Sequence, residues 1–161
     1  MERDRMRPLV DERGFSLAEL LVTIGVIAIL SIASIPTLLT YWQGATLQAG
    51  ARELATAINR GRQLALSRNT KVSVQLSGTS ITMRTAAGLC GTGTLYTGPG
   101  TDGNGAIRLT NGMQVSFAGG TCVLFNNLGA AATANTFTVT NPVTNRTRSV
   151  VVSPSGQVSV Q

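Results

Sequence analysis

One apolar run near the N-terminus limits what this 161-residue chain can fold into. From Phe15 to Leu39 its 25 residues carry a single ionisable side chain, Glu19. As an α-helix the run would be about 37 Å long, which is enough to cross a bilayer with some tilt. Four Arg residues precede the run and only two basic residues follow it by residue 60. The sequence therefore predicts a single membrane span with a cytoplasmic N-terminus and the rest of the chain outside.

Glu19 is the residue that an ordinary secretory signal peptide does not explain. A carboxylate inside the bilayer costs about 2.5 to 3.5 kcal/mol on insertion scales, so such a group usually faces a partner. The signal-peptide alternative has a charged start, an apolar core and the small residues SIAS, which a signal peptidase could cut after Ala33. A signal peptide gives Glu19 no role, so it does not account for this residue.

The order of residues around Glu19 supports a second interpretation. A charged leader ends at Gly14, the apolar run begins at Phe15, and Glu19 is its fifth residue. This order resembles the precursors of type IV pilins and pseudopilins, whose leader ends in Gly and whose helix begins Phe-x-x-x-Glu. The resemblance implies that prepilin peptidase cuts after Gly14 and methylates the new amine of Phe15. It also implies that Glu19 pairs with the N-terminal amine of a neighbouring subunit and so sets the register of a filament.

The same resemblance implies a location and a set of partners. The chain would be a structural subunit of a type IV pilus or of a type II secretion filament, held first in the bacterial inner membrane and its lipid. Its partners would be other pilin or pseudopilin subunits, prepilin peptidase and the inner-membrane assembly platform, and its final place the periplasm or the cell surface. Pro36 lacks an N–H and should kink or loosen the helix, as prolines in this region of the family do in filaments.

Apolar residues continue beyond the span at helical spacing, at Leu47, Ala51, Leu54, Ile58 and Ala65. This spacing predicts that the same helix continues to about residue 68, with an aromatic pair at 41 and 42 suited to the membrane interface. We therefore expect four segments. They are a cleaved leader at 1–14, a transmembrane and assembly helix at 15–40, an amphipathic half of that helix at 41–68, and a β-rich domain at 69–161.

Short segments with alternating apolar residues predict β-strands at 71–76, 80–85, 106–109, 113–117, 122–125, 136–140, 148–153 and 157–160. Turn-forming residues link them, as in SGTS and SPSG. Antiparallel strands beside one long N-terminal helix predict an α+β fold, with the second half of the helix filling the concave face of the sheet. The resemblance implies that this α+β fold is pilin-like. The stretch ELATAINRGRQLALSRNTKVSVQL resembles the helix-to-strand passage of GspH/FimT minor pilins and pseudopilins.

Residues 86–105 are rich in glycine, which predicts a flexible surface loop. The motif DGNG in this loop could suggest calcium, but Asp102 is the only carboxylate residue after Glu53, too few for a hard-cation site. Cys90 and Cys122 are the only cysteines and lie on the expected oxidising side, where pairing is the default. A bridge would stabilise the fold by roughly 3.5 to 4 kcal/mol in the chain-entropy model. Two free thiols are the alternative.

Residue types on which most enzymes depend are missing from this sequence. It has no His, which removes the usual general base and metal ligand. After the span the only acidic residues are Glu53 and Asp102, in different predicted elements, and no nucleophile or Walker motif occurs. We therefore expect a structural subunit that is a substrate of the peptidase, with no enzymatic activity, cofactor or metal.

The net charge of +6 lies wholly after the leader and permits attraction to polyanions. Some FimT-like minor pilins bind DNA through a C-terminal pattern close to Gly-Arg-x-Arg, of which this chain keeps Gly156 and lacks both arginines. The remaining candidates for phosphate contact are Arg108, Arg146 and Arg148, the last two on the same side of a strand. The simpler interpretation is a solvated basic face that keeps the domain soluble.

Overall fold

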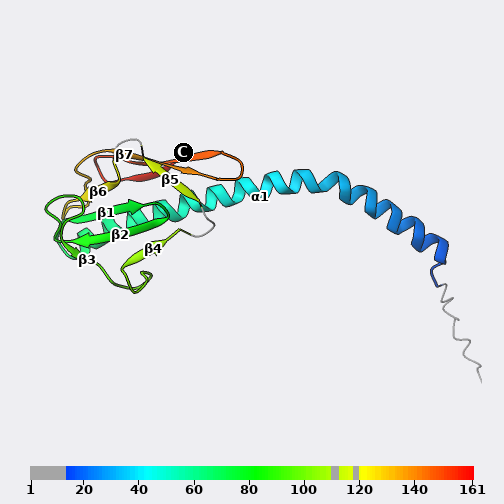
Figure 1. Cartoon of the computed structure of the whole chain (residues 1–161), viewed down its shortest axis with the longest axis horizontal. Coiled ribbons are helices and arrows are strands. Elements are labelled where there is room, and N and C mark those ends of the chain that lie inside the picture. The colour runs from blue at the N-terminus through cyan, green and yellow to red at the C-terminus, as the bar shows by residue number, and fades with distance from the viewer. Residues whose placement is uncertain (1–13, 110–112, 118–119) are drawn as a thin grey trace, which may run out of the picture. The chain divides into compact units, whose positions relative to one another are not determined.

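The computed structural model describes residues 14–109, 113–117 and 120–161, so the predicted leader before Gly14 lies outside the described residues. The described part divides into two compact units, one that ends at Thr40 and one from Tyr41 to Gln161. The elements, drawn in Figure 1, are α1 (Leu17–Ser67), β1 (Val72–Ser77), β2 (Ser80–Thr85), β3 (Thr94–Leu95), β4 (Ala106–Arg108), β5 (Gln114–Phe117), β6 (Cys122–Phe125), β7 (Asn135–Thr140), β8 (Thr147–Val152) and β9 (Val158–Val160).

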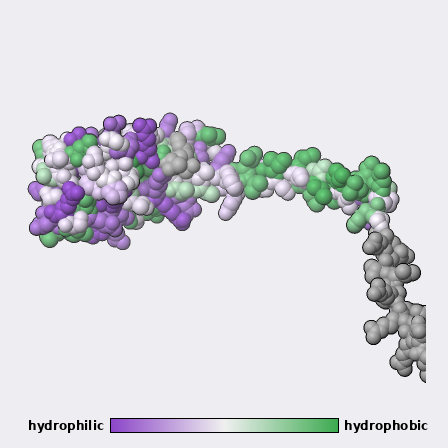
Figure 2. All heavy atoms as spheres, turned by 90° about the horizontal axis from the view of Figure 1, so that it is seen from below, coloured by the Kyte–Doolittle hydropathy of each residue, from purple (hydrophilic) through white to green (hydrophobic). Residues whose placement is uncertain are grey.

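The first unit consists of the apolar part of α1. The side chains from Phe15 to Thr40 are exposed, and Figure 2 shows the hydrophobic surface that they form. By length and composition α1 could cross a membrane, with an 18-residue window of mean hydropathy 2.3 and none of that window buried. Its hydroxyl groups donate to backbone carbonyls one turn earlier, as Ser31 does to Ile27 at 2.8 Å, which hides their polarity from lipid. The helix continues through Pro36, so the loosening that we expected there does not interrupt it.

The second unit has two antiparallel sheets where we expected one. The five-stranded sheet has the order β3-β2-β1-β6, with β4 paired to β2, and the four-stranded sheet has the order β5-β7-β8-β9. In Figure 1 both sheets lie beside the second half of α1. The two-sheet arrangement could not be predicted from short alternating strands, because alternation specifies the buried face of a strand and not its partner.

The strands themselves lie where the sequence predicted them. Each of the eight predicted strands is present, and its bounds differ by no more than one residue at either end. The strand that the sequence missed is β3, which pairs with β2 through Arg84 and Thr85. It lies within the glycine-rich segment, where no alternation of apolar residues marks a strand.

A single core joins the helix to both sheets. The five helix positions predicted to face it are buried, and the core also contains Val72 and Val74 of the first sheet and Phe137 and Val150 of the second. Gly61 lets α1 approach β1 closely, because a Cβ at this position would overlap Cγ2 of Val74. Residues that pack on the core thus come from the whole length of the second unit, which makes it one folded body.

Candidate functional site

The expected processing site lies where α1 begins. Gly14, Phe15 and Ser16 are not helical, and α1 begins at Leu17. Phe15 is 80% exposed. A peptidase needs an accessible backbone that is not closed by helical hydrogen bonds, and this short segment before the helix meets that requirement. The geometry therefore suits a substrate whose helix stays intact after a cut at Gly14.

Glu19 is the acidic residue of the first turn of α1, and its side chain is exposed. It follows Phe15 by four residues, about one helical turn. A carboxylate in the first turn is favoured by the partial positive charge of the helix N-terminus. A cut after Gly14 would create a positive amine at Phe15, so this end of the helix would then carry two opposite charges on an otherwise apolar surface.

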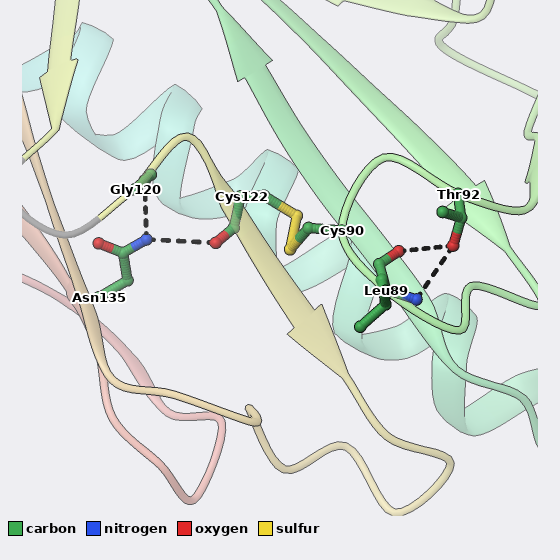
Figure 3. Close-up of a disulfide and its surroundings, with 6 residues drawn as sticks. All are labelled: Leu89, Cys90, Thr92, Gly120, Cys122 and Asn135. Atoms are coloured by element: carbon green, nitrogen blue, oxygen red, sulfur yellow. Dashed lines mark hydrogen bonds between the residues drawn. A yellow bond between two sulfur atoms is a disulfide. The ribbon is translucent and has the colours of Figure 1, made fainter.

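Cys90 and Cys122 form a disulfide with a Cα–Cα distance of 6.0 Å. Cys122 begins β6 and lies opposite Gln75 of β1, whereas Cys90 lies in the segment after β2. Figure 3 shows the turn around Cys90, which Thr92 closes. Its hydroxyl donates to the Leu89 carbonyl at 2.7 Å and accepts from the Leu89 N–H at 3.0 Å. The disulfide thus fixes one end of the glycine-rich segment to the edge strand of the first sheet.

Asn135 connects the same place to the second sheet. It belongs to β7 and is only 5% exposed. Its amide nitrogen donates to the carbonyls of Gly120 at 2.9 Å and of Cys122 at 3.3 Å, as Figure 3 shows. A buried amide left without such partners would destabilise the fold by about 1 to 3 kcal/mol. The disulfide and Asn135 therefore hold the start of β6 from two sides.

The remainder of the glycine-rich segment, which we expected to be a flexible surface loop, is exposed over much of its length but also contacts the rest of the fold. The N–H of Tyr96 donates to the Met83 carbonyl at 2.9 Å, and its ring packs against the core. The guanidinium of Arg68 lies 5.2 Å from the centre of that ring, a favourable cation–π contact. The segment thus contacts α1 near its C-terminal end.

Asp102 organises the turn in which the motif DGNG occurs. Its Oδ1 accepts from the N–H groups of Asn104 at 2.9 Å and Ala106 at 2.8 Å, and its Oδ2 lies 3.5 Å from Nε of Arg108. The hydrogen bond from Ala106, helped by those from Asn104 and Arg108, lowers the pKa of this carboxyl below its ordinary value of 3.8. Within the described residues no three potential metal ligands gather, and Asp102 holds a turn.

The three arginines considered for DNA contact do not share one sheet. Arg108 belongs to β4 of the first sheet and faces Asp102. Arg148 belongs to β8 of the second sheet, and Arg146 lies in the turn just before it. Both of these arginines are exposed. The structure thus leaves Arg146 and Arg148 as a basic pair at the β7–β8 turn.

The structure shows why position 156 is a glycine, which the sequence did not reveal. Its φ of +80° suits glycine, and a Cβ there would overlap the carbonyl oxygen of Gly129. That carbonyl accepts from Nε of Arg62 in α1 at 2.9 Å. Arg62 therefore ties the helix to the β6–β7 turn, which lies close to the β8–β9 turn at Gly156. The only signal in the sequence was an arginine on the polar side of the helix, which is too common to single out.

The family comparison decides what kind of protein carries these features. The family described as type II transport protein GspH matches residues 50–156, and the prokaryotic N-terminal methylation motif matches residues 10–35. The chain belongs to the GspH family. It is thus a structural subunit of the pilin and pseudopilin class, which assembles with other such subunits into a type IV pilus or a type II secretion filament.

Solved structures share the fold of this GspH-family chain. The type IV minor pilin FimU of Pseudomonas aeruginosa is 18% identical, covers 75% of this chain and 92% of its own, and has a TM-score of 0.57. The minor pseudopilin EpsH of the Vibrio cholerae type 2 secretion system is 12% identical, with coverage of 71% and 95% and a TM-score of 0.53. E. coli GspH is 10% identical, with coverage of 73% and 88% and a TM-score of 0.55. No curated protein matches the sequence.

The two matches fall on the two functional parts of this GspH-family chain. The methylation motif contains Gly14, Phe15 and Glu19, and the family match contains the disulfide and every strand of the two sheets except β9. It begins at Gly50 and ends at Gly156, two glycines whose missing side chains permit close contacts in the fold. The two matches therefore cover the start of the apolar helix and most of the domain that follows it.

Proposed function

We propose that this chain is a minor pilin or pseudopilin whose helix at 15–40 anchors it in the bacterial inner membrane before assembly. Prepilin peptidase cuts after Gly14 on the cytoplasmic side and methylates Phe15. The domain from 69 to 161 lies outside the cytoplasm and reaches the periplasm or cell surface when the assembly platform extracts the subunit into a filament. The observation that carries this proposal is the lone carboxylate of Glu19, one helical turn after Phe15, on an otherwise exposed apolar helix.

The chemistry of assembly follows from that carboxylate. In lipid the Glu19 carboxylate and the Phe15 amine are both separated from water, which is unfavourable for each of them. Pairing the Glu19 carboxylate with the amine of a neighbouring subunit relieves both charges at one defined axial offset. Such a buried pair contributes little net stability relative to apolar packing, but an unpaired member costs about 3 to 5 kcal/mol. The pair therefore selects the register, and apolar contact between helices supplies the attraction.

The test is mass analysis of the mature N-terminus of the full chain produced together with prepilin peptidase. We expect a chain that begins at methylated Phe15, and Gly14→Val should leave the precursor uncut. The matched control is Gly25→Val, a glycine in the same helix with no neighbouring atoms around its Cβ position, which should be processed normally. A mature chain that begins after Ala33 would support the signal-peptide alternative and contradict this proposal.

DNA binding has weaker support as an alternative function. Arg108 is engaged with Asp102, and it lies in a different sheet from Arg148. Two exposed arginines would give a weak and strongly salt-dependent contact with phosphates. Retardation of double-stranded DNA by the protein at low and at moderate salt would support a receptor function, and no retardation at either salt would exclude it.

A further inference from the structure

We propose that the β7–β8 turn, residues 141–146, lies on the anionic lipid surface beside Trp42 while the subunit is anchored in the membrane. This inference rests on the proposed function, because it needs the helix at 15–40 to span the bilayer. It adds a second contact between the chain and the membrane, made by the folded unit. The contact is lost when the subunit leaves the membrane for the filament.

The first observation is an apolar groove between α1 and this turn. It is lined by Trp42, Gln43, Thr46, Met113, Asn141, Pro142 and Val143. A second apolar depression adjoins it around Trp42 and contains Tyr41 and Ala45. The large apolar side chains that line the groove and the depression are exposed, and the exposed fraction is 72% for Tyr41, 63% for Trp42 and 77% for Val143. Such a surface on a folded domain indicates a contact with something outside it.

The turn holds Val143 in a defined position. Asn141 is only 4% exposed, and its Oδ1 accepts from the N–H groups of Val143 at 2.9 Å and Thr144 at 3.4 Å. The N–H of Asn141 donates to the Arg146 carbonyl at 2.9 Å, and the N–H of Asn145 donates to the Asn141 carbonyl at 2.9 Å. The exposure of Val143 is therefore built into the turn by a buried asparagine.

The occupant follows from where Trp42 lies along the chain. α1 is continuous from the apolar span through Thr40 and Tyr41 to Trp42, so Trp42 lies within about 5 Å of the end of the span along the helix. Trp and Tyr are enriched at membrane–water interfaces, where their apolar rings and polar atoms are both satisfied. Because the β7–β8 turn contributes to the same groove as Trp42, it lies at the level of the headgroups when Trp42 does.

Charge complementarity favours anionic lipid over other partners. Arg146 and Arg148 are exposed at this turn, and no Asp or Glu follows Asp102 in the sequence. Arginines near an anionic membrane each strengthen binding by about fivefold. A DNA duplex would use the same arginines but would leave the apolar ring of Trp42 and the side chain of Val143 in water. The combination of exposed apolar and basic residues thus fits a lipid interface.

The experiment places a fluorophore on the turn of the full chain in liposomes that contain phosphatidylglycerol and brominated phospholipid. Val143→Cys receives a label that is quenched by bromine, and the native cysteines are engaged in their disulfide. The matched control is Leu128→Cys, because Leu128 is 76% exposed and also lies in a turn. Its neighbour Asn127 bonds to Asn69, at the other end of α1 and about 36 Å or more along the helix from Trp42.

We expect several-fold stronger quenching at position 143 than at position 128. Replacing both Arg146 and Arg148 by Gln should reduce quenching at 143 and remove its dependence on phosphatidylglycerol, whereas Arg108→Gln should not. Equal quenching at 143 and 128 would overturn the inference. A label at 143 that responds to double-stranded DNA or to a second subunit, and not to phosphatidylglycerol, would also overturn it.

The fluorescence of Trp42 tests the membrane anchor independently of the contact made by the turn. Trp42 is the only tryptophan in the chain, so its own fluorescence reports on the end of the span. If brominated lipid quenches Trp42 but not the label at 143, the anchor stands and the contact of the turn is wrong. If brominated lipid quenches neither, the span does not end at Trp42, and both proposals fail.

Discussion

The two halves of α1 differ in what their apolar residues contact. Up to Thr40 the side chains of the helix are exposed, although this is its most hydrophobic part. Beyond Tyr41 the helix has a buried face that packs on both sheets. The hydrophobic residues of one continuous helix therefore differ in their role. In the first half they form an exposed apolar surface that is open to contacts outside the chain, and in the second half they complete the chain's own core.

The exceptional residues of the two halves differ in the same way. In the first half the exception is a charge, Glu19, on an exposed and otherwise apolar surface. In the second half the exceptions are missing side chains, at Gly50 and Gly61, where the side chains of Met113 and Val74 leave no room for a Cβ. The glycines of the second half thus concern folding, whereas we propose that Glu19 in the first half concerns assembly.

The largest expected effect is on assembly and comes from Glu19→Ala. Leader cleavage and the fold of the second unit should be unchanged, because Glu19 is exposed, follows Gly14 by five residues and does not belong to the core. Incorporation into filaments should fall by more than about a hundredfold, as loss of one member of a buried pair costs about 3 to 5 kcal/mol. Incorporation is measured by immunoblot of sheared filaments, with Thr23→Ala as the control. Normal incorporation of the alanine variant would contradict the register role.

Next in size is the loss of the disulfide, which should affect only the second unit. Replacing both Cys90 and Cys122 by Ser should lower the free energy of unfolding by about 2 to 5 kcal/mol, because the unfolded chain regains freedom. Denaturant unfolding of the full chain in detergent measures this, and insertion into the membrane should be unchanged. An unchanged free energy of unfolding would contradict this prediction and would indicate that Asn135 alone holds the start of β6 in place.

A third prediction compares helical glycines across the two halves. Gly61→Ala should destabilise the second unit by about 1 to 3 kcal/mol, because the new methyl group overlaps Val74. Gly25→Ala and Gly44→Ala have no atoms near the added methyl group, so they should be neutral or stabilising by up to about 1 kcal/mol. Thermal unfolding separates these outcomes. Equal effects at Gly61 and Gly44 would show that close packing does not limit position 61.

The smallest effect concerns pH and the Asp102 turn. The pKa of Asp102 is lowered in the folded protein, so its charge stabilises the fold above the ordinary value of 3.8, and this contribution is lost as the pH falls through the lower, folded value. Asp102→Asn keeps an oxygen acceptor but no charge, so its stability should depend less on pH in that window. The measurement is the unfolding midpoint of both proteins across it, and parallel curves would contradict the assignment.

The extent of the helix and the strands could be predicted because each leaves a local pattern. Helical spacing predicted the buried face that contains Leu54 and Ile58. Alternation of apolar residues predicted β1, β2 and β4 to β9. The short β3 has no such pattern. The docking of Tyr96 under Arg68 was missed for a related reason, since an aromatic residue among glycines does not say which surface it will contact.

The processing site was predicted from Gly14, Phe15 and Glu19 alone, and the methylation motif matches that stretch. The pairing of Cys90 with Cys122 was the default for two cysteines, but its geometry depends on β6 lying beside β1. Gly156 was considered only as the remainder of a DNA-binding pattern, whereas its role in the fold depends on the backbone of Gly129. The processing site could be predicted because its residues lie in one short segment. The geometry of the disulfide and the role of Gly156 could not, because they depend on contacts between distant segments.

By itself the sequence predicted the order of parts in this protein: a leader, a helix whose first half has one charge, its amphipathic continuation and a β-rich domain. These features follow from hydrophobicity and spacing along a single stretch of chain. The tertiary structure alone decided that the strands form two sheets, that Arg62 ties α1 to the β6–β7 turn, and that the β7–β8 turn lies beside Trp42. These depend on which segments meet in space, and no local pattern encodes the partner of a surface.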